Sequence, residues 1–149
     1  MADTENHAIR AVDLSTGQTA TLAGTGRQAQ EYPPRAGTAP RAAFSSPWDL
    51  VGVGDRLYIA MAGSHQIWVM DLRTGRVAAH AGSGWEGTRD GNLAEADLAQ
   101  PSGLTYDGKG RLYFVDSEGS SIRWADIDPA GRVGTLAAGS SWRTPTTAS

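Results

Sequence analysis

The stretch Ile67-Trp-Val-Met-Asp71-Leu-Arg-Thr-Gly75 decides the fold, because the chain contains its pattern three times. The other copies are Ile9-Arg-Ala-Val-Asp13-Leu-Ser-Thr-Gly17 and Ile122-Arg-Trp-Ala-Asp126-Ile-Asp-Pro-Ala-Gly131. The copies start 58 and 55 residues apart. Self-similarity at such a period indicates one supersecondary unit that stacks against copies of itself.

Each repeated stretch is predicted to be the third of four strands. An apolar run rich in β-branched and aromatic residues precedes it and follows a glycine-containing turn, which is typical of a buried strand. A strand opened by proline comes before that run, where proline is tolerated as the first strand residue. The strands expected from these signals are 47–53, 56–60, 67–72 and 76–81 in the second copy and 101–107, 111–115, 122–127 and 132–138 in the third. The unit is therefore predicted to be a four-stranded antiparallel meander.

The first copy lacks the strand that proline opens, since Met1-Ala-Asp-Thr aligns with Met61-Ala-Gly-Ser. Long links rich in glycine and proline join the copies, and residues 93–98 of the second link are expected to form one helical turn that packs Leu93 and Leu98 on the sheet. The predicted divisions are a partial unit at 1–26, a second unit with its link at 27–81, a third with its link at 82–138 and a tail at 139–149.

Composition limits the classes of partner. The 149 residues are 40% hydrophobic and 19% charged, as in a globular domain, and the net charge of −3 argues against nucleic acid, which requires clustered Lys and Arg. No apolar run approaches the ~20 residues needed to span a bilayer, so no membrane contact is expected. The absence of cysteine excludes disulfides and thiolate chemistry within this chain. The N-terminus lacks the basic start and apolar stretch of a secretory signal, and a cytoplasmic location is predicted.

The repeats resemble a known family. The stretch from Ala2-Asp-Thr-Glu-Asn-His7 to Leu14, the openings Pro47-Trp-Asp-Leu50 and Pro101-Ser-Gly-Leu104, and the ends Leu22-Ala-Gly-Thr-Gly26 and His80-Ala-Gly-Ser-Gly84 are similar to NHL repeats. More narrowly, Asp90-Gly-Asn-Leu-Ala-Glu-Ala-Asp-Leu-Ala-Gln-Pro-Ser-Gly103 resembles the NHL propeller that follows a thioredoxin-like domain in bacterial proteins. The resemblance implies a six-bladed β-propeller whose blades are four-stranded antiparallel sheets. This chain departs from it by holding two blades and three strands of a third, about half a ring.

An incomplete ring predicts self-association. A propeller blade buries one face on the blade before it and the other on the blade after it, so the end blades of an open arc would expose apolar faces. Burying several hundred Å² of such surface is worth roughly 10 kcal/mol at ~25 cal/mol per Å². A homodimer that nearly completes six blades is favoured, while other closed rings and head-to-tail fibres also satisfy a heterologous interface. What replaces the missing first strand stays open at this point.

Four residues are the candidates for binding, and all lie at the end of a second strand or in the loop that follows it. His7 and His65 occupy corresponding loop positions, with Ser120 there in the third copy, and Asp3 and Asp116 correspond, with Met61 in the second. They could line a channel mouth and bind a cation or a sugar. The competing and favoured interpretation is that the histidines and carboxylates hold backbone amides in tight turns. Asp13, Asp71 and Asp126 recur in every copy before a turn, which predicts Asx turns.

The sequence thus favours a non-catalytic module that self-associates into a ring and serves as a scaffold, with a protein or small-molecule ligand at the channel face. No catalytic residue, metal or cofactor is assigned. The alternative is an enzyme, since some propellers resembling this one are metal-dependent lactonases or lyases. In that interpretation Asp3, His7, His65 and Asp116 would be the ligands of a calcium or zinc ion at the channel mouth.

Overall fold

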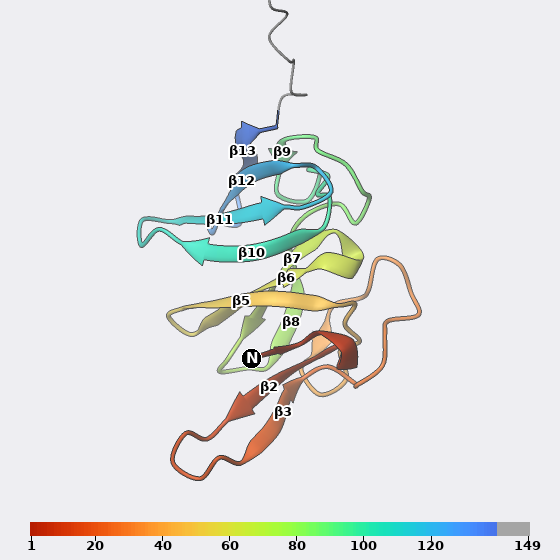
Figure 1. The fold of residues 1–149 in the computed structure, drawn as a ribbon, viewed down its shortest axis with the longest axis vertical. Helices are drawn as coiled ribbons and strands as arrows, with labels where there is room; N and C mark the ends of the chain where they lie inside the picture. The colour runs from red at the N-terminus through yellow and green to blue at the C-terminus, as the bar shows by residue number, and fades with distance from the viewer. Residues whose placement is uncertain (140–149) are drawn as a thin grey trace, which may run out of the picture.

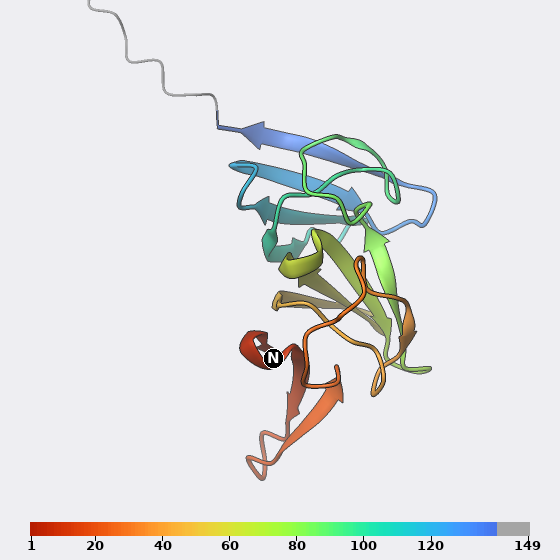
Figure 2. The ribbon, with the colours of Figure 1, turned by 90° about the vertical axis from the view of Figure 1, so that its right-hand side faces the viewer.

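Three antiparallel sheets follow one another in the computed structural model, which describes residues 1–139. Figures 1 and 2 show the sheets stacked in chain order, with the N-terminal sheet at one end and the C-terminal sheet at the other. We call them blade 1, blade 2 and blade 3. The predicted all-β architecture of propeller blades is confirmed. The tail expected at 139–149 lies, apart from Gly139, outside the described residues.

Blade 1 is the three-stranded unit expected at the start of the chain. Its strand order is β1-β2-β3, formed by β1 (Ala2–Asp3), β2 (Ala8–Val12) and β3 (Thr19–Ala23), and the short 3-10 turn η1 (Thr4–Asn6) joins the first two strands. The N-terminal amino group of Met1 donates to the carbonyl oxygen of Arg10 at 2.7 Å. This bond extends the pairing of β1 with β2 by one residue.

Blades 2 and 3 contain the predicted four-stranded meander. Blade 2 consists of β5 (Pro47–Val53), β6 (Arg56–Met61), β7 (Gln66–Asp71) and β8 (Arg76–Ala81), with η2 (Ala62–Ser64) between β6 and β7. Blade 3 consists of β10 (Pro101–Tyr106), β11 (Arg111–Asp116), β12 (Ser121–Asp126) and β13 (Arg132–Ala138). Figure 1 shows β5 and β10 lying side by side across the same side of the molecule.

A fifth short strand, which the sequence did not predict, lies at the outer edge of both complete blades. The link before each blade turns back along the fourth strand, so that β4 (Gly37–Thr38) pairs with β8 and β9 (Gly91–Asn92) pairs with β13. The outer strand of a sheet presents unpaired backbone groups, and the link satisfies part of them. Each link is therefore an integral part of the blade that follows it.

The turn predicted at 93–98 forms as a single hydrogen-bonded turn and does not continue into a helix. The carbonyl oxygen of Asn92 accepts from the amides of Glu95 and Ala96, both at 3.0 Å. Leu93 and Leu98 are buried, as expected. The turn brings both leucines into the apolar layer between blades 2 and 3.

Apolar side chains fill the two spaces between successive blades. Between blades 1 and 2, Ile9 and Ala23 contact a larger set from blade 2 that includes Ile59, Met61 and Trp68. Between blades 2 and 3 the cluster is contributed by both sheets and the second link, and its fully buried members include Tyr58, Ile67, Leu98, Leu112 and Phe114. Blade 2 thus packs through opposite faces on its two neighbours, as a blade of a propeller does. Within residues 1–139 we find no helix with the length and apolar character needed to cross a bilayer.

Candidate functional site

His7 and His65 each hold the start of the next blade. Both residues end a 3-10 turn in the left-handed conformation, with φ of 48° and 53°. The Nδ1 atom of His7 accepts from the amide of Ser46 at 3.0 Å, and that of His65 accepts from the amide of Gln100 at 3.2 Å. Ser46 and Gln100 are the residues before the prolines that open β5 and β10. The two histidines therefore cap backbone amides between blades.

Asp116 belongs to a buried ion pair. Its Oδ2 atom accepts from Nη1 of Arg123 at 2.8 Å and its Oδ1 atom from the amide of Ala99 at 2.7 Å, and the side chains of both Asp116 and Arg123 are fully buried. Arg123 also donates to the carbonyl oxygens of Arg89 and Asp97 in the second link. Burial raises the pKa of Asp116, and the hydrogen bonds from Arg123 and from the Ala99 amide oppose that shift. The pair fastens the link to its blade.

The two positions that Asp116 and Arg123 occupy in blade 3 hold different residues, or the same residues with different exposure, in blades 1 and 2. In blade 1, Asp3 accepts from Nε of Arg10 at 2.9 Å in a pair that is about a quarter exposed, with side-chain values of 23% and 26%. In blade 2 the aligned residues are Met61 and Trp68, both fully buried and apolar. A carboxylate at this position is therefore paired with an arginine seven residues later, and it is replaced together with that arginine. The joint replacement of both residues in blade 2 is a pattern in the sequence from which the pairing of Asp3 and of Asp116 with an arginine could have been predicted.

The four predicted site residues are not brought together. Asp3 is engaged with Arg10 and Asn6, Asp116 with Arg123, and each histidine with a different link. In the described part of the chain, no group of three or more His, Cys, Asp or Glu side chains has a geometry that could hold a metal ion. The two histidines contact the next blade's opening segment, while the two carboxylates pair with an arginine of their own blade.

The Asx turns form in blades 1 and 2 and change in blade 3. Oδ1 of Asp71 accepts from the amides of Arg73 and Thr74 at 2.8 and 3.1 Å, and Asp13 makes the equivalent bonds. The blade 3 turn is one residue longer, and there Asp128 accepts from the amide of Ala130. The carboxylate of Asp126 instead binds Nε of Arg111 at 2.9 Å. With one more residue in the turn, the carboxylate of Asp126 thus binds the side chain of Arg111 and no longer closes an Asx turn.

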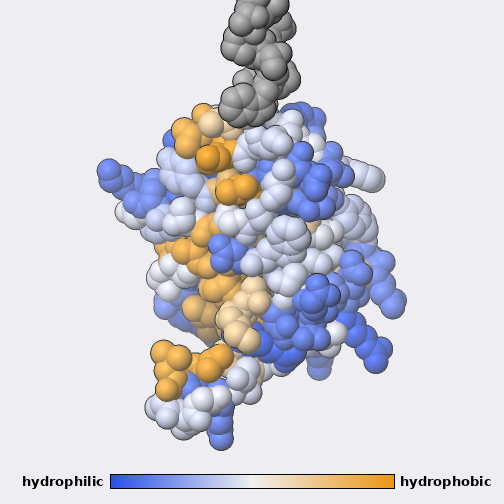
Figure 3. Space-filling view, in the orientation of Figure 1, coloured by the Kyte–Doolittle hydropathy of each residue, from blue (hydrophilic) through white to orange (hydrophobic). Residues whose placement is uncertain are grey.

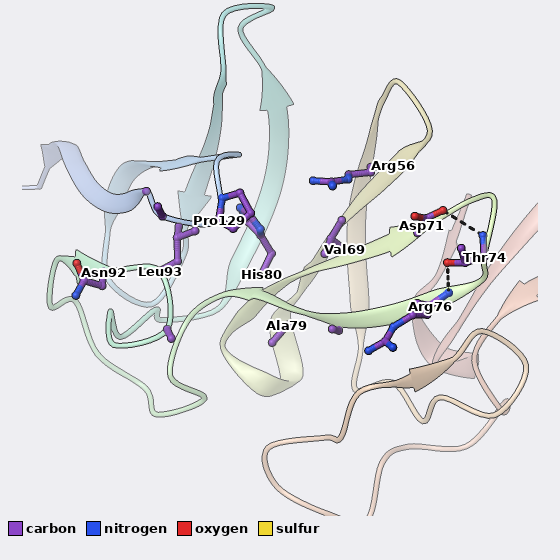
Figure 4. Close-up of a pocket in the computed structure, with 14 residues that line it drawn as sticks. Arg56, Val69, Asp71, Thr74, Arg76, Ala79, His80, Asn92, Leu93 and Pro129 are labelled. Carbon is purple, nitrogen blue, oxygen red and sulfur yellow. Dashed lines mark hydrogen bonds between the residues drawn. The ribbon is translucent and has the colours of Figure 1, made fainter.

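A cleft of about 800 Å³ lies between the outer parts of blades 2 and 3 (Figure 4). Strands β6, β7 and β8 line it from blade 2, and the turn after Asn92 and the β12–β13 turn line it from the other side. Its apolar lining includes Val69, Ala78, Ala79, Leu93, Ala94 and Pro129. The charged lining residues are Arg56, Arg76 and Asp71, with His80 at the wall. None of these four was among the predicted site residues.

His80 joins the two walls of the cleft. Its Nε2 atom lies 2.8 Å from the carbonyl oxygen of Asp126 in blade 3, and its ring packs edge-on against Tyr58 with the centroids 5.1 Å apart. Burial lowers the pKa of His80 below its ordinary value, the charge of Arg56 adds to that effect, and the bond to Asp126 opposes it. His80 is therefore a neutral contact between blades at pH 7.

Comparison with known proteins is consistent with this architecture. The chain is 40% identical over 137 residues to Protein SUPPRESSOR OF QUENCHING 1, chloroplastic, of Arabidopsis thaliana, a match that covers 88% of this chain and 13% of that protein. It is 38% identical over 150 residues to human NHL repeat-containing protein 2, covering 85% of this chain and 20% of the relative. The chain consists of NHL-repeat propeller blades. It spans one fifth or less of the length of these relatives.

Solved structures share the fold of this chain at lower sequence identity. A protein of unknown function from Bacteroides thetaiotaomicron superposes with a TM-score of 0.73 at 21% identity, covering 91% of this chain and 32% of that one. An auxiliary nutrient binding protein from Bacteroides ovatus superposes with a TM-score of 0.61 at 22% identity, covering 90% and 34%. No family model matches the chain.

We expect His80 to make the stability of these NHL blades depend on pH. The aligned residues are Leu22 in blade 1 and Leu136 in blade 3. Because its pKa is lower in the folded chain than in the unfolded chain, the unfolded chain takes up a proton first as the pH falls. The stability contributed by neutral His80 is complete above the unfolded-state pKa of about 6.5 and is lost as the pH falls through the folded-state pKa. Urea unfolding at pH 7.5 and 5.5 should show a smaller loss of stability in His80→Leu than in the wild type. An equal loss in both proteins would contradict the assignment.

Proposed function

We propose that the chain is a non-catalytic NHL propeller segment that assembles with copies of itself into a ring and acts as a scaffold or binding module. The observation that carries the proposal is the outward face of blade 3. The proposal is also supported by the candidate site residues, since the polar groups of Asp3, His7, His65 and Asp116 are used to hold turns and links.

The outward face of blade 3 is the surface expected to bind another copy. It corresponds to the face of blade 2 that packs on blade 3. Tyr58 and Ile67 of that face are 1% and 0% exposed because blade 3 covers them. The aligned residues of blade 3 are Tyr113 and Ile122, which lie on its outward face. No later blade covers this face within residues 1–139, and Ile122 is 45% exposed. Three further members of this face are Val115, Trp124 and Leu136.

Figure 3 shows apolar side chains gathered over blade 3 and continuing as a band toward blade 1 on the side where β10 and β5 lie. A soluble monomer rarely exposes apolar side chains in so continuous an arrangement. A further blade stacked on blade 3 would remove from water those that lie on the outward face of blade 3, in the way that blade 3 covers blade 2. The blade of a second copy would be the cover.

The opposite face of the arc, on blade 1, carries the Asp3–Arg10 ion pair together with Thr21. These polar groups are compatible with a covered surface, because the aligned pair Asp116–Arg123 is fully buried in blade 3. Val12 and Met1 provide exposed apolar surface beside the pair. The two ends of the arc therefore differ in composition, as expected for a heterologous, head-to-tail contact.

The assembly is tested by measuring the mass in solution of the wild type and of Ile122→Asp, using light scattering coupled to size exclusion. We expect the wild type at a multiple of 15.6 kDa and the variant as a monomer with an unchanged circular dichroism spectrum, because Ile122 is half exposed in the isolated arc. Leu14→Asp is the control, since Leu14 is 96% exposed at the β2–β3 turn and lies outside the face. A wild-type monomer at tens of micromolar would overturn the proposal.

A further inference from the structure

We propose that the cleft between blades 2 and 3 binds an extended acidic peptide segment, whose carboxylate is held by Arg56 and attracted by the further positive charge of Arg76, while its apolar neighbours rest on the lining of the cleft. This inference goes beyond the ring assembly, because every lining residue comes from one chain. It stands whether or not copies associate.

The repeats supply an internal comparison for Arg56. The aligned residue in blade 3, Arg111, is fully engaged: its Nε donates to Asp126 at 2.9 Å and its guanidinium lies 3.8 Å from the ring centroid of Trp124. Arg56 has the corresponding cross-strand partner in Asp71 and has Val69 in place of the tryptophan. Among residues 1–139, its guanidinium makes no ion pair and no hydrogen bond.

Turn chemistry explains why Arg56 has lost its partner. Asp71 is bound to the amides of Arg73 and Thr74, and these bonds lower its pKa and keep it ionised. In blade 3 the extra turn residue lets Asp128 accept the turn amide of Ala130, so that Asp126 binds Arg111 through Oδ1 and the amide of Arg132 through Oδ2. The shorter turn of blade 2 therefore releases one guanidinium toward the cleft. Figure 4 shows Arg56 extending from β6 above Val69, toward the side where Pro129 lies.

Arg76 supplies the second guanidinium. Its backbone amide donates to Thr74 Oγ1 at 3.3 Å, while its side chain has no acidic partner within the described residues. Of the acidic groups, Asp71 lines the cleft and accepts two turn amides through Oδ1, and Asp126 accepts from Arg111 and from the amide of Arg132. Arg56 is therefore the group that binds the carboxylate, through charge-assisted hydrogen bonds, and Arg76, whose side chain leaves β8 on the side away from Arg56 in Figure 4, adds positive charge to the cleft.

The rest of the cleft selects an apolar, elongated ligand. The lining beyond the arginines consists largely of alanine, valine, leucine and proline side chains, and His80 at the wall is neutral at pH 7. The stretch from Arg76 to His80 runs along β8 for about 13 Å at ~3.3 Å per residue. A ligand of this length with one carboxylate and apolar flanks matches an extended peptide of about four residues.

The test is a calorimetric titration with the peptide Ala-Leu-Glu-Leu-Ala, acetylated and amidated so that glutamate carries its only charge. We expect one peptide to bind per chain, and binding at least about tenfold tighter than that of the same peptide with glutamine. The double variant Arg56→Gln/Arg76→Gln should bind both peptides equally weakly. The matched control is Arg27→Gln/Arg35→Gln, which removes the same charge outside the cleft and should change the affinity less than about twofold.

Three results would overturn the proposal: no binding of the glutamate peptide at about millimolar concentration, equal affinity for the two peptides, or equal weakening by both double variants. Hexanoate serves as a small carboxylate with an apolar tail. If it binds as tightly as the peptide, the cleft takes a small organic acid and the peptide assignment is wrong. Circular dichroism of both double variants checks that the fold is retained, as expected for exposed arginines, of which only Arg35 has an acidic partner, the exposed Glu31.

Discussion

Replacing Arg123 with methionine is expected to lower the free energy of unfolding by about 3–5 kcal/mol, as measured by urea denaturation at pH 7. The substitution removes the guanidinium from a fully buried pair and leaves the Asp116 carboxylate in an apolar layer with only the Ala99 amide as a partner. It also removes the guanidinium from the carbonyl oxygens of Arg89 and Asp97 and from the carboxylate of Asp90, so that the second link keeps its pairing with β13 but loses these contacts with blade 3.

Blade 1 provides the matched control, Arg10→Met. In the Ile122→Asp background, in which copies are expected not to associate, the Asp3–Arg10 pair occupies the same position and is partly exposed, so that its loss should cost less than about 1 kcal/mol. The double variant Asp116→Met/Arg123→Met should be markedly more stable than the sum of the single effects predicts, because no buried charge is left unpaired. Equal destabilisation by Arg123→Met and Arg10→Met, or strict additivity in blade 3, would show that burial of the pair is unimportant.

Replacing Gly82 with alanine is expected to destabilise the protein by about 3 kcal/mol or more, since backbone strain and overpacking each contribute about 1–3 kcal/mol. Gly82 follows β8 with φ of +104°, and an added Cβ would lie 2.6 Å from the carbonyl oxygen of His65. The backbone of Gly82 is also fixed by two hydrogen bonds. Its amide donates to the carbonyl oxygen of Leu93, and its carbonyl oxygen accepts from the side-chain amide of Gln66. The chain cannot move away from the clash without breaking these bonds.

Gly17→Ala separates the effect of the backbone angle from that of the close contact. Gly17 has φ of +72°, and an added Cβ would meet nothing within 4 Å. We expect a loss of only about 1–2 kcal/mol, which is the cost of the left-handed conformation for an L-residue. Thermal or urea unfolding compares the two variants. If Gly82→Ala proves no more harmful than Gly17→Ala, the close approach of the link to the loop at His65 is not under steric constraint.

The contrast between blades also explains how a repeat protein acquires a site without a new fold. Blades 2 and 3 share the arginine at the start of the second strand and the aspartate at the end of the third. Around this arginine they differ in the length of one turn and in the residue that faces the guanidinium, Val69 or Trp124. Those two local changes decide whether the arginine is a structural partner or a group available to a ligand, and the cleft titration measures the difference.

The sequence by itself determined the architecture, because the pattern of apolar and turn residues within each copy is local and occurs in all three copies. Every strand of the meander was predicted from three signals: the three copies of Ile-x-x-x-Asp before a turn, the apolar runs and the strand-opening prolines. Only the two-residue strands β4 and β9 were missed. Those strands form where a polar link meets the open edge of another strand. No pattern within a segment of two residues can indicate such a contact.

Only the tertiary structure decided what the polar residues do. His7, His65, Asp3 and Asp116 have side chains typical of a binding site, and their partners are a link amide or an arginine that folding brings close. Conversely, Arg56 and Arg76 look in the sequence like ordinary surface charges, and their significance comes from the partners they lack. A partner for a charge is set by distances between segments far apart in the chain, and these distances exist only once the blades are stacked.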